Sequence, residues 1–112
     1  MNLPLLLFCA GVFAFVVGAV LFAVALRDLK PLGGDGWREF HHAYYGAALL
    51  ALAALSWAVG WEWPAGLLSL VGGLVALDDG YQHHRQAASG DLAYETPLKR
   101  WVYARFPGLS KY

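Results

Sequence analysis

Charged residues are scarce in this sequence. Only 14% of the 112 residues are Asp, Glu, Lys or Arg, and eight cationic side chains balance eight acidic ones, so the formal net charge is zero. Soluble domains usually carry about 25% charged residues. The scarcity excludes a disordered charged tail, and the balance excludes a nucleic-acid binder that is held by positive charge.

Cysteine is nearly absent as well. Cys9 is the single cysteine, which excludes a disulfide framework within the chain and a metal site built from several thiolates. Apolar residues instead make up 59% of the sequence, against roughly 45–50% in soluble domains. A water-soluble domain of this size could not bury so much apolar surface, so a lipid bilayer is the simplest cover for it.

The apolar residues are concentrated in three runs. The first, residues 3–26, has about 24 residues without a charge and would form about 36 Å of helix, enough to cross a ~30 Å hydrocarbon core. A cleaved signal peptide is the alternative for this run, although the positively charged start of such a peptide is missing. The second run, residues 41–60, would form about 30 Å of helix. The third begins at Pro64 and stays apolar for only about 14 residues, so a span over residues 64–86 must carry both Asp78 and Asp79 below the surface of the bilayer or very near it.

The distribution of positive charge predicts the orientation of these spans. All eight cationic residues lie either between the first two runs or after the third. With three spans these two segments share one side of the membrane, which the positive-inside rule assigns to the cytoplasm. We therefore predict an all-α integral membrane protein whose residues 1–90 form a bundle of three transmembrane helices. Its N-terminus would lie outside and its C-terminus in the cytoplasm, in a membrane of the bacterial inner-membrane type.

The remaining segment, residues 91–112, is too polar for a fourth span. Thr96 followed by Pro97 has the pattern of a helix cap and a first helical residue, and Leu98 and Trp101 then follow helical spacing beside cationic side chains. This pattern predicts a short interfacial helix on the cytoplasmic leaflet. An irregular tail that docks on a partner protein is the alternative.

Small residues recur along the first run at helical spacing. They form a stripe that consists of Ala10, Gly11, Ala14, Gly18 and Ala25. In membranes, small residues let a second helix approach closely. Ordinary packing inside the bundle explains the stripe, and docking of a helix from another chain is the alternative. We therefore expect the bilayer, and other membrane subunits or further copies of the chain, as partners, and no nucleic acid.

All four histidines occur as two pairs, and carboxylates accompany both pairs. The group consists of Glu39, His41, His42, Asp78, Asp79, His83 and His84. Ionisable residues within or beside membrane spans are costly and by default mark ion paths, relays or cofactors. If the hairpin between the second and third runs turns near Glu62, residues whose numbers add to about 124 lie at equal depth. His41 would then lie level with His83, and both histidine pairs would meet at the cytoplasmic end of the bundle.

The spacing within this group favours a metal site. Glu39 and His42 are three residues apart and Asp79 and His83 are four apart, so each couple shares a helix face. Glu-x-x-His is an element of carboxylate-bridged di-iron bundles, and imidazole with carboxylate suits iron, zinc or manganese. These four residues are the expected ligands. The residues that would hold a second ion or hydrogen-bond the ligands are His41, Asp78, Gln82 and His84.

Two other arrangements of the polar group stay open. In the first, the polar group is purely structural, and Asp78 and Asp79 pair with Arg38 or Arg85. In the second, haem b is held between His42 and His83, one from each helix.

Two functions follow from these alternatives. The first is a small membrane metalloprotein with redox or hydrolytic chemistry at its cytoplasmic end, a role that the concentration of polar residues favours. The second is an accessory or structural subunit of a larger respiratory or photosynthetic membrane complex, which the small size of the chain favours. Neither the substrate nor the partner is specified by the sequence.

Overall fold

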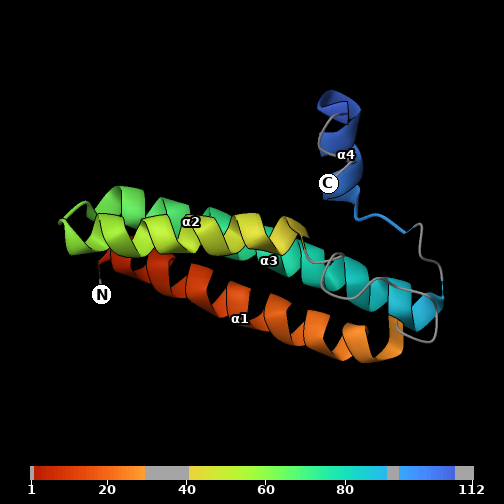
Figure 1. Cartoon of the computed structure of the whole chain (residues 1–112). Coiled ribbons are helices and arrows are strands. Elements are labelled where there is room, and N and C mark those ends of the chain that lie inside the picture. Colours follow the sequence, from red (N-terminus) through yellow and green to blue (C-terminus); the bar gives the residue numbers. More distant parts are fainter. Residues whose placement is uncertain (1, 30–40, 91–93, 108–112) are drawn as a thin grey trace.

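The computed structural model describes residues 2–29, 41–90 and 94–107, and over these residues it contains α-helices and no strand (Figure 1). This confirms the all-helical prediction. The helices are α1 (Leu3–Leu29), α2 (His41–Ala58), α3 (Glu62–Ser89) and α4 (Pro97–Arg105). The predicted short C-terminal helix is therefore present as α4.

Helix α3 is the centre of the bundle. It packs along both α1 and α2, whereas α1 and α2 touch each other at few positions. Helix α1 runs parallel to α3, because Gly11 approaches Gly73 and Gly18 approaches Gly80 further along both helices. Helix α2 runs antiparallel to α3, and α4 stands across the direction of the other three helices (Figure 1).

The contact between α1 and α3 is made by glycine backbones. A Cβ atom at Gly73 would overlap the carbonyl oxygen of Gly11, and one at Gly80 would overlap that of Gly18. The hydroxyl of Ser69 on α3 donates a hydrogen bond of 2.7 Å to the carbonyl oxygen of Phe8 on α1. The small-residue stripe is therefore used inside the chain. Its buried positions are Gly11, Ala14, Gly18 and Ala25, whereas Ala10 is exposed.

The register between α2 and α3 differs from the one expected from the sequence. Helix α2 ends at Ala58 because Gly60 adopts a left-handed conformation with φ of +86° in the turn before α3. Gly46 packs against Gly72 and Ala76, so residues of α2 and α3 lie level when their numbers add to about 120. The sum expected from the sequence is about 124. The hairpin therefore has its midpoint two residues earlier than expected, and this moves α2 by four residues relative to α3.

This register corrects the predicted depth of the histidine pairs. The backbone of His41 lies about level with Asp79, and that of His42 about level with Asp78. His83 lies about one helical turn beyond the first residue of α2. The expectation that His41 would lie level with His83 is therefore wrong.

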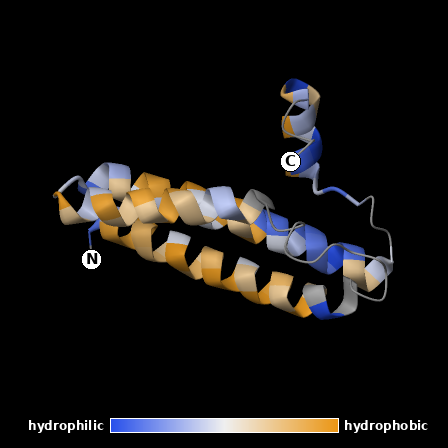
Figure 2. Ribbon diagram, viewed as in Figure 1, coloured by the Kyte–Doolittle hydropathy of each residue, from blue (hydrophilic) through white to orange (hydrophobic). Residues whose placement is uncertain are grey.

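Large apolar side chains lie on the outside of the bundle and small ones inside it. Ala53, Ala65 and Ala76 are fully buried, whereas Phe13 on α1 and Leu55 on α2 are 72% and 65% exposed. In Figure 2 the ribbon is coloured as apolar along most of the three long helices and changes to hydrophilic along the last part of α3. In water the large apolar side chains would be expected inside, so this distribution is inverted.

Only α1 among the described helices is both long and apolar enough to cross a membrane by itself, over Leu3–Ala25. Helix α2 has a shorter apolar stretch, Ala43–Ala58. Helix α3 has the length but carries polar residues from Asp78 onward, which lowers its mean hydropathy. A first span is thus supported, and the predicted count of three is not confirmed by this criterion.

Candidate functional site

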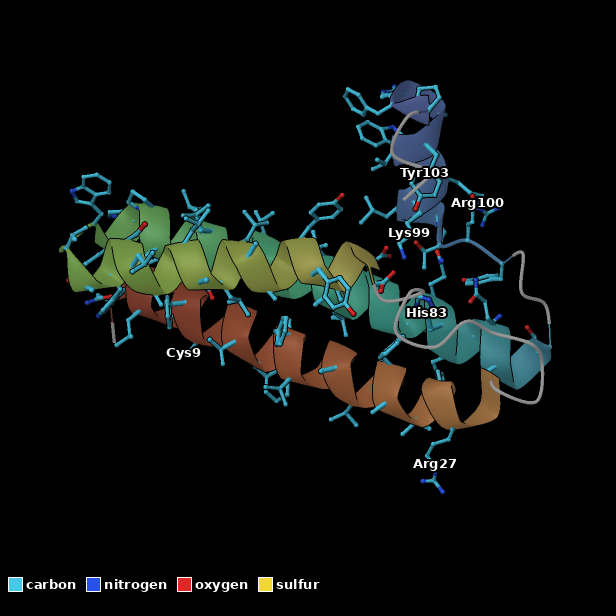
Figure 3. The ribbon with its side chains drawn as sticks, in the orientation of Figure 1. Cys9, Arg27, His83, Lys99, Arg100 and Tyr103 are labelled. Atoms are coloured by element: carbon cyan, nitrogen blue, oxygen red, sulfur yellow. The ribbon has the colours of Figure 1, made fainter. Side chains whose placement is uncertain are left out.

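Polar side chains are buried where the start of α4 and the residues before it meet the second half of α3. Figure 3 shows Lys99 and Tyr103 on the part of α4 that lies nearest to α3, on which His83 is labelled. The buried polar residues of α3 in this region are Asp79, Gln82, His83 and Gln86. Since α4 and the residues before it cover this stretch, the site is formed by parts of the chain about twenty residues apart.

An ion pair lies at the centre of the site. The Lys99 Nζ atom is 2.5 Å from Asp79 Oδ1, and the two side chains are 7% and 0% exposed. The second carboxylate oxygen, Oδ2, lies 3.6 Å from Nδ1 of His83. Removing a carboxylate and an ammonium from water is costly, and a close, charge-assisted hydrogen bond offsets that cost. The pair therefore joins α4 to α3 at a point that water does not reach.

The start of α4 is set by a helix cap that also contacts α3. The Thr96 hydroxyl accepts a hydrogen bond of 3.3 Å from the backbone N–H of Lys99 and donates one of 3.1 Å to Asp78 Oδ2. Pro97 occupies the first turn of the helix, where its missing N–H costs nothing. This cap fixes the direction of Lys99 and thereby delivers its ammonium to Asp79.

The segment before α4 is held along α3 by further contacts. The side-chain amide of Gln86 donates a hydrogen bond of 3.0 Å to the carbonyl oxygen of Tyr94, and the guanidinium of Arg85 lies 5.5 Å from the centre of the Tyr94 ring. The backbone N–H of Thr96 donates a longer bond of 3.4 Å to the Gln82 side chain. Residues 94–99 thus follow α3 closely.

His83 connects the site to α1. Its Nδ1 lies 2.8 Å from the carbonyl oxygen of Asp79, and its ring meets the ring of Phe22 edge-on with centres 5.2 Å apart. Because a carbonyl oxygen only accepts, Nδ1 carries the proton in this bond. In the neutral imidazole, Nε2 is then the nitrogen with the lone pair.

Tyr103 lies on α4 near the same carboxylates. Burial raises the pKa of its phenol to about 12, and the charges of Glu95, Asp79 and Asp78 act in the same direction. The phenol is therefore protonated at neutral pH and has a proton to donate to a hydrogen-bond acceptor.

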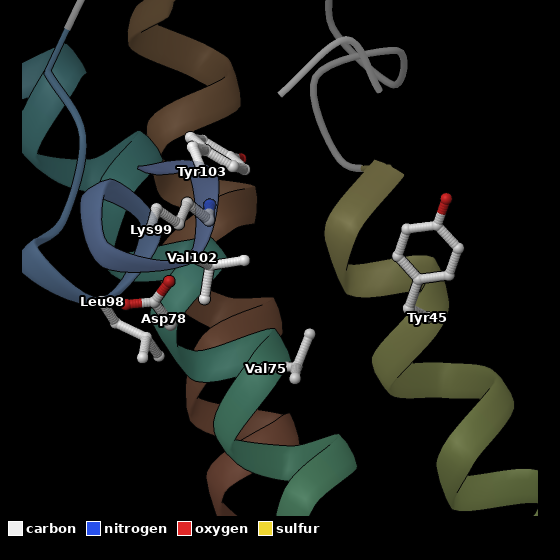
Figure 4. Close-up of a pocket in the computed structure, with 7 residues that line it drawn as sticks. All are labelled: Tyr45, Val75, Asp78, Leu98, Lys99, Val102 and Tyr103. Atoms are coloured by element: carbon white, nitrogen blue, oxygen red, sulfur yellow. The ribbon is translucent and has the colours of Figure 1, made fainter. Parts of the chain in front are cut away.

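A cavity of about 150 Å³ lies beside the ion pair, between α4 and the bundle (Figure 4). Leu98 and Val102 of α4 form one wall, and Val75 of α3 and Tyr45 of α2 form the other. Its lining is almost entirely apolar, although Asp78, Lys99 and Tyr103 contribute atoms to its edge. The cavity lies where α3 changes from apolar to polar residues.

The structure brings together only part of the expected metal site. Glu39 and the side chains of His41 and His42 lie outside the described residues. Within residues 2–29, 41–90 and 94–107, no group of three or more His, Cys, Asp or Glu side chains is placed to hold a metal ion. Asp79 and His83 do meet, whereas Asp78 contacts Thr96, and His84 is half-buried beside them in sequence without a described contact to either.

The residue that sequence reasoning missed is Lys99. The sequence pattern predicts Lys99 as a cation of the interfacial helix and offers Arg38 or Arg85 as the partner of the aspartates. The Thr96-Pro97 pattern could have indicated it. This pattern predicts a helix cap at Thr96, and the residue whose backbone N–H bonds to that cap, in the first turn of α4, is Lys99.

The chain matches no known protein family, no curated protein and no solved structure.

Proposed function

We propose that this chain is a small integral membrane protein that serves as an accessory subunit of a larger membrane complex. Its three long helices would lie in the bilayer and α4 on one membrane surface. The observation that carries the proposal is the inverted distribution of side chains, with Gly, Ala and Ser inside the bundle and large apolar side chains outside. Helices in membranes associate in this way, because lipid covers the large side chains and small residues allow close packing.

Three spans are supported by the surface that α3 presents. The residues of α3 that face α1 and α2 are mostly small, as at Gly72 and Gly73. These small residues lower the mean hydropathy of α3, but they pack against the other helices and would not contact lipid. Its outward positions before the polar stretch are apolar, since Leu67, Val71 and Leu74 are all about half exposed. The apolar parts of α2 and α3 are shorter than the ~30 Å hydrocarbon core, which local thinning of the bilayer accommodates.

An accessory role is supported by the partners of the two carboxylates. Asp79 is held by the Lys99 ammonium and Asp78 by the Thr96 hydroxyl, so both carboxylates fix α4 to α3. Such an arrangement holds α4 in a fixed position at one end of the bundle. A subunit that binds other proteins requires a fixed surface of this kind. The partners would be other membrane subunits or further copies of the chain. They would contact a surface other than the small-residue stripe, most of which is buried against the rest of the chain.

Orientation is tested by labelling single cysteines in intact cells with a membrane-impermeant maleimide. In a Cys9→Ser background, Trp61→Cys should be labelled from outside, and Ser89→Cys only after the membrane is permeabilised, because positive charges flank the end of α3. The opposite pattern would refute the proposed orientation.

The accessory role is tested by the size of the particle extracted in mild detergent. We expect the 12.2 kDa chain to migrate with a larger complex on native gels. Proteins that co-purify with a tagged copy of the chain should be identified, and tagging each of them in turn should recover the chain. A chain that runs as a monomer under every mild extraction condition overturns the accessory role.

A second candidate function is the metal site, and the geometry of His83 favours it. Histidines that bind metals commonly donate their other ring N–H to a backbone carbonyl, as His83 Nδ1 does to Asp79. The backbones of His41 and His42 also lie level with Asp79 and Asp78 across the helix pair. An ion of iron, zinc or manganese would have to take the carboxylate from Lys99. Haem b is less well supported, because His42 and His83 are separated by about five residues, or about 7.5 Å, along the bundle.

The metal hypothesis is tested by measuring metal atoms per chain in untagged protein purified without chelator. One or two atoms of iron, zinc or manganese, lost in Asp79→Asn, would support it. Substoichiometric amounts of every one of these metals would remove it and leave the accessory role.

A further inference from the structure

Helix α4 has an apolar face that the rest of the described chain leaves partly uncovered. Successive residues of an α-helix are rotated by about 100°, so Leu98, Trp101 and Val102 share one face. Arg100 is rotated by about 200° from Leu98 and lies on the other face. Leu98 and Trp101 are each 53% exposed, so about half of each side chain is available to a partner.

The apolar face of α4 is turned towards the apolar part of the bundle. On this side, Leu98 and Val102 line the cavity together with Val75 of α3. Val75 lies about one turn before Asp78, where α3 is still apolar. Arg100 instead projects towards the polar end of α3 (Figure 3). The two faces of α4 therefore point in the same directions as the apolar and the polar parts of α3.

This orientation is the one that a helix adopts on a membrane surface. Helix α4 stands across the three long helices (Figure 1), at the level where α3 changes from apolar to hydrophilic residues (Figure 2). A helix in the plane of a membrane turns its apolar side chains towards the acyl chains and its polar ones towards water. The Arg105 guanidinium lies 4.4 Å from the centre of the Trp101 ring. Tryptophan is enriched at membrane interfaces, and the long stem of arginine lets its charge reach the headgroups.

Helix α1 indicates where the membrane boundary crosses the other side of the bundle. Gly18 packs against Gly80, so a residue of α1 lies level with the residue of α3 whose number is 62 higher. Val24 therefore lies about 12 Å beyond Asp78 along the bundle, yet it is apolar and 44% exposed. The first charged residue of α1 is Arg27. A boundary perpendicular to the bundle at Asp78 would leave Val24 in water, whereas an oblique one from α4 to Arg27 keeps it in lipid (Figure 3).

We propose that α4 is inserted into the membrane interface by the face that carries Leu98, Trp101 and Val102, with Arg100 in water. The boundary then runs obliquely from α4 to Arg27, so the three long helices are tilted, as transmembrane helices are by about 20° on average. This rests on the membrane location in the proposed function and assigns the lipid interface as the partner of one face of α4. The buried ion pair between α4 and α3 would set the depth of insertion.

Spin labels on single cysteines test the insertion in the full chain. The chain, in a Cys9→Ser background, is reconstituted in vesicles of phosphatidylcholine and phosphatidylglycerol. Oxygen concentrates in lipid and a nickel chelate stays in water, so the ratio of their collision rates with a label reports its surroundings. The ratio should be high at Leu98→Cys and Trp101→Cys. It should be several-fold lower at the matched controls Arg100→Cys and Ala104→Cys, which lie one turn apart on the other side of the same helix.

A second pair of labels tests the oblique boundary. Val24→Cys on α1 and Arg85→Cys on α3 are both exposed and differ by about one residue in level along the bundle. The proposal expects a high ratio at Val24→Cys and a low one at Arg85→Cys. A boundary perpendicular to the bundle gives both positions the same ratio.

A label at Phe13→Cys, a position that is 72% exposed on α1, tests the membrane location itself. A low ratio there would overturn the membrane location and with it the insertion. A high ratio at Phe13→Cys with equal ratios on the two sides of α4 would overturn the insertion and leave the proposed function standing. Equal ratios at Val24→Cys and Arg85→Cys would overturn the oblique boundary. Because each side of α4 is measured at two positions, a single label that displaces the helix does not decide the result.

Discussion

Replacing Lys99 by Met removes the ammonium that neutralises Asp79 and keeps a long side chain in the same space. The carboxylate is fully buried, so Lys99→Met leaves a negative charge without its counter-charge in the interior. Breaking a buried pair in this way costs about 3–5 kcal/mol. The other contacts of the segment, such as Thr96 with Asp78 and Gln86 with Tyr94, contribute about 1 kcal/mol each and cannot offset that loss.

The loss should appear as release of α4 and not as unfolding of the bundle. Helices α1, α2 and α3 pack through their own glycine and alanine contacts, none of which involves Lys99. A cost of about 3 kcal/mol raises the equilibrium population of released α4 by roughly 100-fold, at about 1.4 kcal/mol per factor of ten. Helix content should therefore change little.

Trypsin cleavage at Arg105 measures this population, because cleavage follows the open fraction when opening and closing are fast. Lys99→Met should be cut far faster than the wild-type chain, and Arg100→Met, which removes an exposed cation from the same helix, should not. Asp79→Asn together with Lys99→Met should restore most of the resistance, since neither charge is then buried alone. Equal cleavage of Lys99→Met and the wild-type chain, or no recovery in the double variant, would refute the role assigned to the ion pair.

Three further variants test the packing and the charge of the site. Gly73→Ala should separate α1 from α3 and cost about 1–3 kcal/mol in thermal unfolding, because the new Cβ meets the Gly11 carbonyl, whereas Leu74→Ala, at an exposed position, should cost little. Ser69→Ala loses one hydrogen bond between helices and should cost only about 0.6 kcal/mol in the same assay. In Tyr103→Phe the phenolate absorbance should lack the ionisation near pH 12. With the pKa of Tyr103 raised from 10.0 to about 12, docking of α4 is fully supported below pH 10 and weakens as the pH rises towards 12, the range in which the phenolate absorbance of Tyr103 should appear.

The apolar runs were sufficient to predict which segments are helical, but not how they are aligned. The first run was expected over residues 3–26 and α1 extends to Leu29, because helix geometry continues past the last apolar residue. The alignment of α2 with α3 depends on where the turn lies. From the sequence the turn is expected near Glu62, whereas the left-handed Gly60 places it two residues earlier. A two-residue difference is within the usual uncertainty of helix ends read from sequence, yet it moves each histidine by about one turn relative to α3.

The candidate site was predicted only in part for a related reason. Asp79 and His83 lie one turn apart on a single helix, so local geometry was enough to bring them together. The approach of Lys99 instead depends on α3 ending at Gly90, which is left-handed with φ of +76°, and on Tyr94 and Thr96 contacting Gln86 and Gln82 of α3. No periodicity in the sequence encodes that path. Long-range contacts of this kind were therefore the part of the site that sequence reasoning could not supply.

The two functions make opposite use of the Asp79 carboxylate, and Lys99 separates them. If the carboxylate serves only to hold α4, removing the ammonium releases the helix and creates no affinity for metal. If the carboxylate is a ligand that Lys99 occupies in place of an ion, removing the ammonium makes it available, and metal content per chain should rise. Because the added positive charge of an ion would replace that of Lys99 at Asp79, the two cations compete for one site. The metal content of Lys99→Met, measured beside its trypsin sensitivity, therefore distinguishes a structural ion pair from a metal site that the chain itself keeps closed.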